Sequence, residues 1–486
     1  MRANGIQFLL NNELILLENI DPNMTVLQYL RELRFSSGTK EGCASGDCGA
    51  CTVVIAELSP TNPKELVYKS INACIAFIGS VHAKQLITIE HIKQDKKLHH
   101  VQQAIVDNHA SQCGFCTPGF VMSSFALQKA NNKPEREEVI EALAGNLCRC
   151  TGYRSIIDAA MESNNSNDKD SFDKNYSQTV KKLAELNNLY AVELNHSNKQ
   201  YFAPKSITEL SKHLLANPDS ILLAGGTDLA LSVTQNLASI DQLVYLGDVK
   251  ELHQIQHEND ELMIGSAVPY SKFTPLLEKH YPELGEMIER IGSKQIRNNG
   301  TLGGNIGNAS PIGDMPPALI ALGSEITLQR GEQQRKILLE DYFVGYKKTT
   351  LAESEFIRNI FIPQPNKAQS LKLYKISKRF DDDISAVLAA IFIELKDDQV
   401  TTIRIAFGGM AEIPKRAKHC ETALLAKTFN QQNIDLAKKA LTKDFSPMTD
   451  VRASNKYRMK VAQNLIQKCF IELTNQNIKT RVINYA

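Results

Sequence analysis

Eight of the ten cysteines in this 486-residue chain lie before residue 151, and only Cys420 and Cys469 follow it. A small secreted domain would use such a density of cysteine for disulfides. The N-terminal segment lacks the basic region, apolar core and cleavage site of a secretory signal, so we expect a cytoplasmic protein with reduced thiols. Metal ligation by thiolates is then the better explanation of this distribution.

The first four cysteines follow the pattern Cys43-x4-Cys48-x2-Cys51, with Cys74 further along. This spacing is typical of plant-type ferredoxins, in which four thiolates hold a [2Fe-2S] cluster. Glycines beside the ligands would let the backbone wrap closely around a cluster whose sulfides accept N–H bonds. The alternatives are zinc and structural cysteines, but zinc knuckles favour paired C-x2-C motifs and this segment has one.

The other four cysteines form two pairs, Cys113-x2-Cys116 and Cys148-x-Cys150. Taken alone, these pairs are compatible with zinc, redox-active or structural cysteines. Pro118 follows the first pair and Gly152 follows the second, which predicts that both pairs lie at helix termini that face one another.

Hydrophobic periodicity predicts different folds around the two groups. Strands are expected at residues 6–10, 14–17, 52–58 and 66–69, with a helix at 25–34. This order fits a small β-grasp-like unit. Helices are expected at residues 101–108, 118–130, 136–143 and 155–161, in the manner of a four-helix bundle.

The polar stretch ESNNSNDKDSFDKN at residues 162–175 has the composition of a flexible linker. After it, we expect a helix at 208–215 and a strand at 221–223, then a final α+β unit with strands at 386–395 and 402–407 and helices at 422–425 and 456–473. The expected domains are therefore residues 1–90, 91–162, 195–368 and 369–486, with a linker at 163–194.

Charge and hydropathy exclude two classes of partner. The chain has 55 Lys and Arg against 54 Asp and Glu, so neither nucleic acid nor an anionic lipid surface is expected to bind it. No run approaches 18 apolar residues, so we expect no membrane association.

Two glycine-rich stretches, at residues 221–228 and 297–314, lie beyond the linker. Neither fits the G-x-G-x-x-G fingerprint, which disfavours an ordinary dinucleotide fold. Successive backbone N–H groups in such stretches can cradle a pyrophosphate, and Thr301 and Asn305 could add side-chain donors. The alternative is that these are turn glycines of an α/β domain.

These motifs together resemble the molybdenum hydroxylases, the xanthine dehydrogenase and aldehyde oxidase family. The resemblance rests on all eight cysteines, on QCGFCTPGF and GNLCRCTGY around the second group, on the glycine-rich stretches, and on YKISKRFDDDISAV at 374–387 and FGGM at 407–410. It implies a multidomain α+β fold: a β-grasp plant-type ferredoxin domain, a four-helix-bundle [2Fe-2S] domain, an FAD-binding domain of the vanillyl-alcohol-oxidase (PCMH) type, and a C-terminal α+β flavoprotein domain.

The resemblance also implies site residues, none of them catalytic. The metal ligands would be Cys43, Cys48, Cys51, Cys74, Cys113, Cys116, Cys148 and Cys150. The FAD contacts would be Leu222, Leu223, Ala224, Gly225, Gly226, Thr227, Asp228, Thr301, Asn305, Asn308, Asp314, Ile357 and Lys375. Lys375 could stabilise an anionic reduced flavin, Asp314 could bind a ribityl or ribose hydroxyl, and Ile357 could pack on the isoalloxazine. Lys375 could instead be a solvated surface lysine. The acidic run at 381–383 would be a solvated turn, or lie near the nicotinamide-binding mouth.

Within the family, KRFDDDISAV is most similar to xanthine dehydrogenases, and the chain resembles the small subunit of a two-subunit form. That resemblance implies a molybdopterin-binding large subunit as partner, in a higher oligomer of the heterodimer. Xanthine or hypoxanthine would be hydroxylated on the partner, and electrons would pass through two [2Fe-2S] clusters to FAD and NAD⁺. The alternatives are another molybdenum hydroxylase, with a different substrate or oxygen as acceptor, a stand-alone electron carrier, or a redox sensor.

Overall fold

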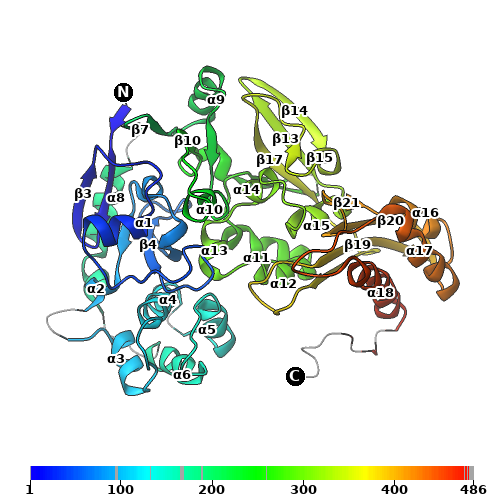
Figure 1. Cartoon of the computed structure of the whole chain (residues 1–486), viewed down its shortest axis with the longest axis horizontal. Helices are drawn as coiled ribbons and strands as arrows, with labels where there is room; N and C mark the ends of the chain where they lie inside the picture. The colour runs from blue at the N-terminus through cyan, green and yellow to red at the C-terminus, as the bar shows by residue number, and fades with distance from the viewer. Residues whose placement is uncertain are drawn as a thin grey trace. The chain divides into compact units, whose positions relative to one another are not determined.

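The computed structural model describes residues 2–93, 97–131, 133–164, 169–187, 190–258, 260–475, 477–478 and 480. The chain forms two compact units, Met1–Lys250 with Gly292–Gly300, and Glu251–Ile291 with Thr301–Ala486. Figure 1 colours the elements of both units in chain order. The short segment Gly292–Gly300 thus belongs to the first unit, although the chain on both sides of it belongs to the second.

The first unit begins with a mixed five-stranded sheet of order β3-β2-β6-β4-β5. Its strands are β2 (Ile6–Leu10), β3 (Glu13–Leu17), β4 (Thr52–Leu58), β5 (Leu66–Asn72) and β6 (Gln85–Ile87). The predicted helix at 25–34 starts as α1 (Val26–Gln28), capped by Thr25, but continues as a π-helical stretch, Tyr29–Leu33. The sequence pattern placed this helix correctly, but it gave no sign of the wider turn.

The predicted helical bundle follows α2 (Ile89–Ile92). Its helices are α3 (His100–Asp107), α4 (Thr117–Ala130), α5 (Arg136–Leu143) and α6 (Arg154–Ser163), which lie together in Figure 1. Phe120, Phe125 and Ile156 are buried among them, and Val54 of β4 belongs to the same apolar cluster. The ferredoxin-like sheet and the bundle therefore share a hydrophobic core.

The predicted linker at 163–194 is largely ordered structure, which corrects the expectation. It contains α7 (Ser171–Lys174), α8 (Tyr176–Leu186) and the start of β7 (Ala191–His196). Phe172 joins the core of the bundle, and Leu183 packs with Leu9 of the sheet. Phe172 is the one apolar residue of the polar stretch at 162–175, so composition alone hid it, whereas Leu183 lies beyond that stretch. Residues 165–168 and 188–189 of the predicted linker lie outside the described residues.

A second sheet of the first unit has the order β1-β7-β8-β10-β9. Its strands are β1 (Arg2–Asn4), β7 (Ala191–His196), β8 (Lys199–Ala203), β9 (Ile221–Leu223) and β10 (Gln242–Tyr245). Three helices belong to this part of the unit, namely α9 (Ile207–Ala216), α10 (Leu229–Thr234) and α13 (Lys294–Asn299). The parallel pairing of β1 with β7 joins the extreme N-terminus to a strand almost 190 positions later, since Ala3 pairs with Val192.

The second unit holds an antiparallel sheet of order β11-β12-β17-β13-β14. Its strands are β11 (Ile255–Glu258), β12 (Glu261–Gly265), β13 (Glu325–Arg330), β14 (Gln333–Leu338) and β17 (Phe356–Pro363), and a small pair is formed by β15 (Phe343–Gly345) and β16 (Lys348–Thr349). The helices here are α11 (Tyr270–His280), α12 (Pro282–Glu289), α14 (Leu302–Gly307) and α15 (Met315–Leu322).

A second sheet of this unit, of order β18-β19-β20-β21, is covered on both faces. Its strands are β18 (Gln369–Ile376), β19 (Val387–Lys396), β20 (Gln399–Gly408) and β21 (Lys415–Arg416). Leu388 and Ala390 of β19 belong to the cluster that contains α15, whereas Val387 and Ala389 pack with the C-terminal helices. Those helices are α16 (Lys418–Leu424), α17 (Gln431–Asp444) and α18 (Asn455–Thr474). The periodicity of the sequence did not predict α17, and α16 begins four residues before the helix predicted at 422–425.

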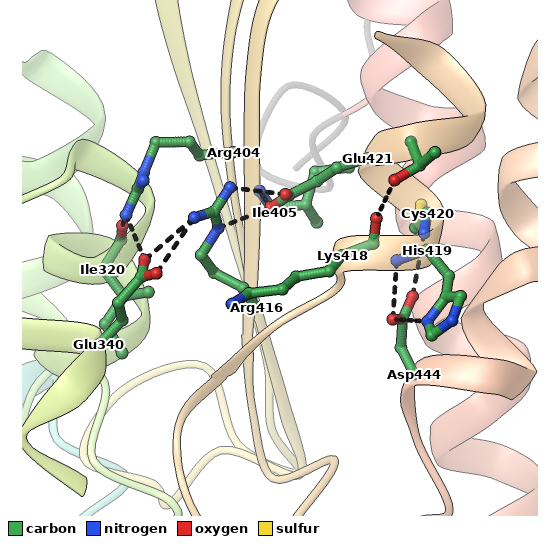
Figure 2. A network of polar contacts seen from close by, with 11 residues as sticks. Ile320, Glu340, Arg404, Ile405, Arg416, Lys418, His419, Cys420, Glu421 and Asp444 are labelled. Atoms are coloured by element: carbon green, nitrogen blue, oxygen red, sulfur yellow. Dashed lines mark hydrogen bonds and ion pairs between the residues drawn. The ribbon is translucent and has the colours of Figure 1, made fainter.

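Figure 2 shows the polar contacts that join the parts of this unit. Arg404 Nη2 lies 2.5 Å from Glu340 Oε2, and Arg416 Nη1 lies 3.1 Å from the same oxygen. Partial burial raises the pKa of Glu340, but the two guanidinium groups outweigh it and hold the pKa below its ordinary value. Asp444 accepts the His419 and Cys420 backbone N–H groups at 2.9 and 3.0 Å, which fixes the start of α16.

None of the described helices combines the length and apolar character that a membrane span needs.

Candidate redox sites

The first four cysteines meet at one edge of the ferredoxin-like sheet. Cys43, Cys48 and Cys51 lie in the loop before β4, and Cys74 lies in a short 3-10 helix, Ala73–Ile75, after β5. The Cys43 sulfur accepts hydrogen bonds from the Cys48 and Cys74 thiols, and Cys74 also contacts Cys51. The structure therefore brings the four predicted ligands together.

The loop also directs backbone donors at this sulfur group. The N–H groups of Ser45 and Cys48 each lie 3.4 Å from Cys43 Sγ. Hydrogen bonds from the neighbouring thiols hold the pKa of Cys43 well below its ordinary value, and the same contacts raise the pKa values of Cys48 and Cys74. Four thiolates this close would repel one another unless a cationic centre balanced them, which is what iron supplies.

The second group lies at helix termini, as predicted. Cys116 is the N-cap of α4, and Cys148 and Cys150 precede α6. Cys116 contacts Cys148, and Cys113 contacts Cys150. Although slight burial raises the pKa of Cys148, hydrogen bonds from Thr151 and from the Cys150 N–H lower it to about 7.

The sulfurs of the second group form two contacting pairs, whereas in the first group Cys43 contacts both Cys48 and Cys74. Among the described residues, no set of three or more His, Cys, Asp or Glu side chains surrounds a point where a single metal ion could sit. A [2Fe-2S] cluster is held by four thiolates, two on each iron, and each group supplies four cysteines.

The first glycine-rich stretch forms a tight loop between β9 and α10 in the first unit. A Cβ atom at Gly225 would lie 1.9 Å from the Asn299 carbonyl oxygen, so no larger residue fits. Within the described residues, the backbone N–H groups of Gly225, Gly226 and Thr227 donate to no acceptor. Successive backbone N–H groups that are half-buried and unpaired can bind the oxygens of a pyrophosphate.

This loop is adjacent to the first cysteine group. The helix after it, α10, packs against the 3-10 helix that carries Cys74. Gln235 at the end of α10 donates from Nε2 to the carbonyl oxygens of Cys43 and Ala44, at 3.2 and 2.9 Å. Gln235 was not predicted from the sequence, because an isolated glutamine 192 positions from its partner leaves no local pattern.

In the second unit, the second glycine-rich stretch includes α14. Thr301 caps this helix by accepting the Gly304 N–H at 3.0 Å. Asn305 Oδ1 is buried and has no hydrogen-bond partner among the described residues. Ile357 is buried, and its Cδ1 would lie 3.7 Å from a Cβ at Gly307. The unpaired acceptor of Asn305 fits a bound ligand that supplies a hydrogen-bond donor. Ile357, which lies beside the glycine backbone, fits a ligand with a flat apolar surface.

Lys375 and Asp314 form a buried ion pair in this unit. The Lys375 side chain is 2% exposed and its Nζ lies 2.6 Å from Asp314 Oδ2. Asp314 Oδ1 accepts the Ser385 hydroxyl at 2.5 Å. A solvated lysine is therefore excluded, and both carboxylate oxygens of Asp314 already have protein donors. The acidic run at 381–383 is an exposed or half-exposed turn, in which Asp383 accepts the N–H groups of Arg379 and Ile384.

The second unit also contains a cavity of about 290 Å³, and none of the residues that line it is a predicted site residue. Its lining includes Glu340, Arg416, His419 and Asp444, the residues of the polar network in Figure 2. Because these charges are paired with one another, we assign the cavity a structural role.

Four domain families match the chain in the expected order. They are described as a 2Fe-2S iron-sulfur cluster binding domain at residues 11–79, a [2Fe-2S] binding domain at 88–161, an FAD binding domain in molybdopterin dehydrogenase at 195–365, and a CO dehydrogenase flavoprotein C-terminal domain at 372–473. The predicted multidomain α+β fold is thus confirmed. Fold and sites together define an iron-sulfur flavoprotein.

Similar proteins narrow this class. Xanthine dehydrogenase of Emericella nidulans is 32% identical over 91% of this chain, and xanthine dehydrogenase/oxidase of Rattus norvegicus is 31% identical over 89%. The chain spans 36% of the length of each. The chain belongs to the molybdenum hydroxylase family, of which it carries the iron-sulfur and FAD-binding domains.

Solved structures agree with that assignment. Carbon monoxide dehydrogenase from Hydrogenophaga pseudoflava, in a form that lacks the Mo-pyranopterin moiety, superposes with a TM-score of 0.54 at 27% identity, covering 56% of this chain and 96% of that one. Quinoline 2-oxidoreductase from Pseudomonas putida 86 gives a TM-score of 0.52 at 26% identity, covering 56% and 95%.

Proposed function

We propose that this chain conducts electrons from a molybdopterin-binding partner through two [2Fe-2S] clusters to FAD and then to NAD⁺. The observation that carries the proposal is the order of the sites within the first unit. Cys113 and Cys150 of the second group are exposed, whereas Cys51 and Cys74 of the first group are buried and none of its cysteines is exposed. The glycine-rich loop is adjacent to the first group through α10 and Gln235. An electron that enters at the surface would meet the sites in that sequence.

We propose that the eight cysteines ligate the clusters, Cys43, Cys48, Cys51 and Cys74 the first and the other four the second. When bound, the clusters supply one-electron steps and FAD supplies the two-electron exchange with a nicotinamide. The protein orients these groups: backbone N–H groups bond to sulfur, and the turns beside the ligands exclude side chains.

For the flavin, we propose contacts in each unit. In the first unit, the N–H groups of residues 222–228 would bind phosphate oxygens. In the second unit, Thr301, Asn305, Asn308 and Ile357 would contact the cofactor. We revise the role of Lys375: because its charge is balanced by Asp314, the pair would present a neutral, rigid hydrogen-bonding surface rather than a free cation.

We propose xanthine or hypoxanthine as the substrate of the partner, because the curated relatives that match over about nine-tenths of this chain are xanthine dehydrogenases. The similarity to carbon monoxide dehydrogenase and quinoline 2-oxidoreductase favours a second candidate, another molybdenum hydroxylase with the same electron path. We also propose that the protein works in the cytoplasm, in a higher oligomer of a heterodimer.

Copurification from the native host tests the proposal. We expect a tagged chain to recover a larger chain that contains molybdenum, and the complex to reduce NAD⁺ with xanthine. Turnover of quinoline or carbon monoxide, but not xanthine, would favour the second candidate. Recovery of a monomer with no molybdenum partner would contradict both.

A further inference from the structure

One backbone hydrogen bond connects the two cysteine groups. The Leu147 N–H donates to the Cys48 carbonyl oxygen at 3.0 Å. Cys48 belongs to the first group, and Leu147 directly precedes Cys148 of the second group. A path from one ligand to the other therefore needs only main-chain covalent bonds and this single hydrogen bond.

The two loops approach each other at backbone distance. Gly49 has φ +67°, and a Cβ atom there would lie 2.2 Å from the Gly145 carbonyl oxygen. Only glycine allows this approach. This close approach does not by itself fix the register between the loop of Cys48 and the loop of Cys148. Side chains that contact both loops must fix it.

Asn146 is the first such side chain and is almost completely buried, at 2% exposure. Its Nδ2 donates to the Gly49 carbonyl oxygen at 3.0 Å and to Thr52 Oγ1 at 3.2 Å. A carbonyl oxygen can only accept, so Gly49 fixes which end of the Asn146 amide faces the first loop. Asn146 Oδ1 then faces Ser123 of α4, whose hydroxyl donates to it at 2.6 Å.

Gln295 completes this network from α13 and is 1% exposed. Its Nε2 lies 3.1 Å from Asn146 Oδ1, and 3.2 Å from both Thr52 Oγ1 and Ser123 Oγ. The three acceptors lie on β4 directly after Cys51, on α4, which Cys116 caps, and in the loop before Cys148, so one amide contacts segments of both cysteine groups. Gln295 belongs to Gly292–Gly300, a segment that packs in the first unit although the residues before and after it belong to the second.

We propose that Gln295 is a positioning residue for electron exchange between the two clusters. Its hydrogen bonds hold the loop of Cys48 against the loop of Cys148, in the register in which the Leu147 N–H donates to the Cys48 carbonyl oxygen. Electron transfer between the clusters can then follow covalent bonds and one hydrogen bond, with no through-space step. The inference rests on the proposed function, since it assumes that both groups hold clusters. Gln295 lies within residues 195–365, which match the FAD binding domain. A residue of that domain would therefore set the coupling between two clusters that the domain does not ligate.

The test compares Gln295→Met with a matched variant of the same helix. Gln295→Met keeps the length of the side chain and removes the donor. Asn298→Leu removes another buried amide of α13, whose side-chain hydrogen bonds among the described residues go to Ser70 of β5, at 2.9 Å to its carbonyl oxygen. Both are made in the full chain with its clusters, and iron content is measured first.

Three readouts are taken: hydrogen exchange of the peptide containing residue 147, the rate at which an electron redistributes between the clusters by freeze-quench paramagnetic resonance, and the magnetic coupling of the fully reduced clusters. We expect Gln295→Met to retain its iron, to raise exchange about threefold to tenfold, as loss of a neutral buried hydrogen bond predicts, and to slow redistribution and weaken coupling. Asn298→Leu should match the wild type in all three.

Unchanged exchange and redistribution in Gln295→Met would overturn the inference. If that variant does not fold, Ser123→Ala, which removes the hydroxyl bond to Asn146 from α4, must give the same three changes, and wild-type behaviour there would overturn it equally. A wild-type chain without iron would refute the proposed function instead, and the exchange measurement would still report on the network alone.

Discussion

Lys375 Nζ and Asp314 Oδ2 lie 2.6 Å apart, and both side chains are buried in the second unit. Breaking a buried pair on one side leaves an uncompensated charge, at a cost of about 3–5 kcal/mol. We therefore expect Lys375→Met to destabilise the second unit by roughly 3 kcal/mol, as measured by denaturant unfolding.

Lys372→Met is the control for this prediction. Lys372 lies on the same strand and pairs with Glu283 at 2.9 Å, but both side chains are more than 20% exposed. Its loss should cost about 1 kcal/mol or less. Equal costs for the two variants would contradict the assignment of Lys375 and Asp314 as a buried pair.

Cysteine variants test the separation of the two clusters. We expect about four iron atoms and four sulfides per chain, with Cys43→Ser and Cys148→Ser each removing a different paramagnetic resonance signal from the reduced protein. Cys420→Ala, in the core of the second unit, should change neither signal. Loss of both signals from one ligand variant that remains folded would show that the sites are not independent.

The glycine-rich loop of the first unit should not tolerate a side chain. Gly225→Ala would place a methyl group 1.9 Å from the Asn299 oxygen, so the loop must move and FAD content should fall severalfold, measured by absorbance after gel filtration. Gly345→Ala is the control, because its Cβ would meet nothing closer than 3.9 Å. Full FAD content in Gly225→Ala would remove this loop from the flavin site.

His82 should make stability depend on pH. Burial lowers its pKa to about 4 from 6.5, and its Nδ1 accepts the Gln7 N–H at 3.1 Å, a bond that protonation would break. His82 binds a proton more readily in the unfolded chain than in the folded chain. The free energy of unfolding should therefore rise by about 3 kcal/mol as the pH increases from 4 to 6.5. His82→Gln should flatten the profile over that range in denaturant unfolding, and an unchanged slope would contradict the assignment.

The sequence allowed both cysteine groups and most helices of the bundle to be predicted, because ligand spacing and helical periodicity are local. It could not indicate that β1 pairs with β7, or that Gln295 packs between the cysteine loops, since these contacts join residues more than a hundred positions apart. Phe172 and Leu183 were missed for a different reason: a few buried anchors suffice to order a polar segment.

The roles predicted for Lys375 and Asp314 also depended on whether the two side chains contact each other, which the sequence does not show. Each residue type suits a flavin contact when considered alone. Their 61-residue separation gave no reason to pair them, and pairing changes the chemistry that each can offer.

An anaerobic titration with NADH tests the central claim most directly. The purified chain, replete in iron and FAD, should accept about four electrons from about two NADH, two on the flavin and one on each [2Fe-2S] cluster. The flavin absorbance should bleach, and two distinct paramagnetic resonance signals should appear. Xanthine should reduce none of these groups when the molybdenum partner is absent. A replete preparation that NADH does not reduce, or in which NADH reduces the flavin and neither cluster, would contradict the proposed path of electrons.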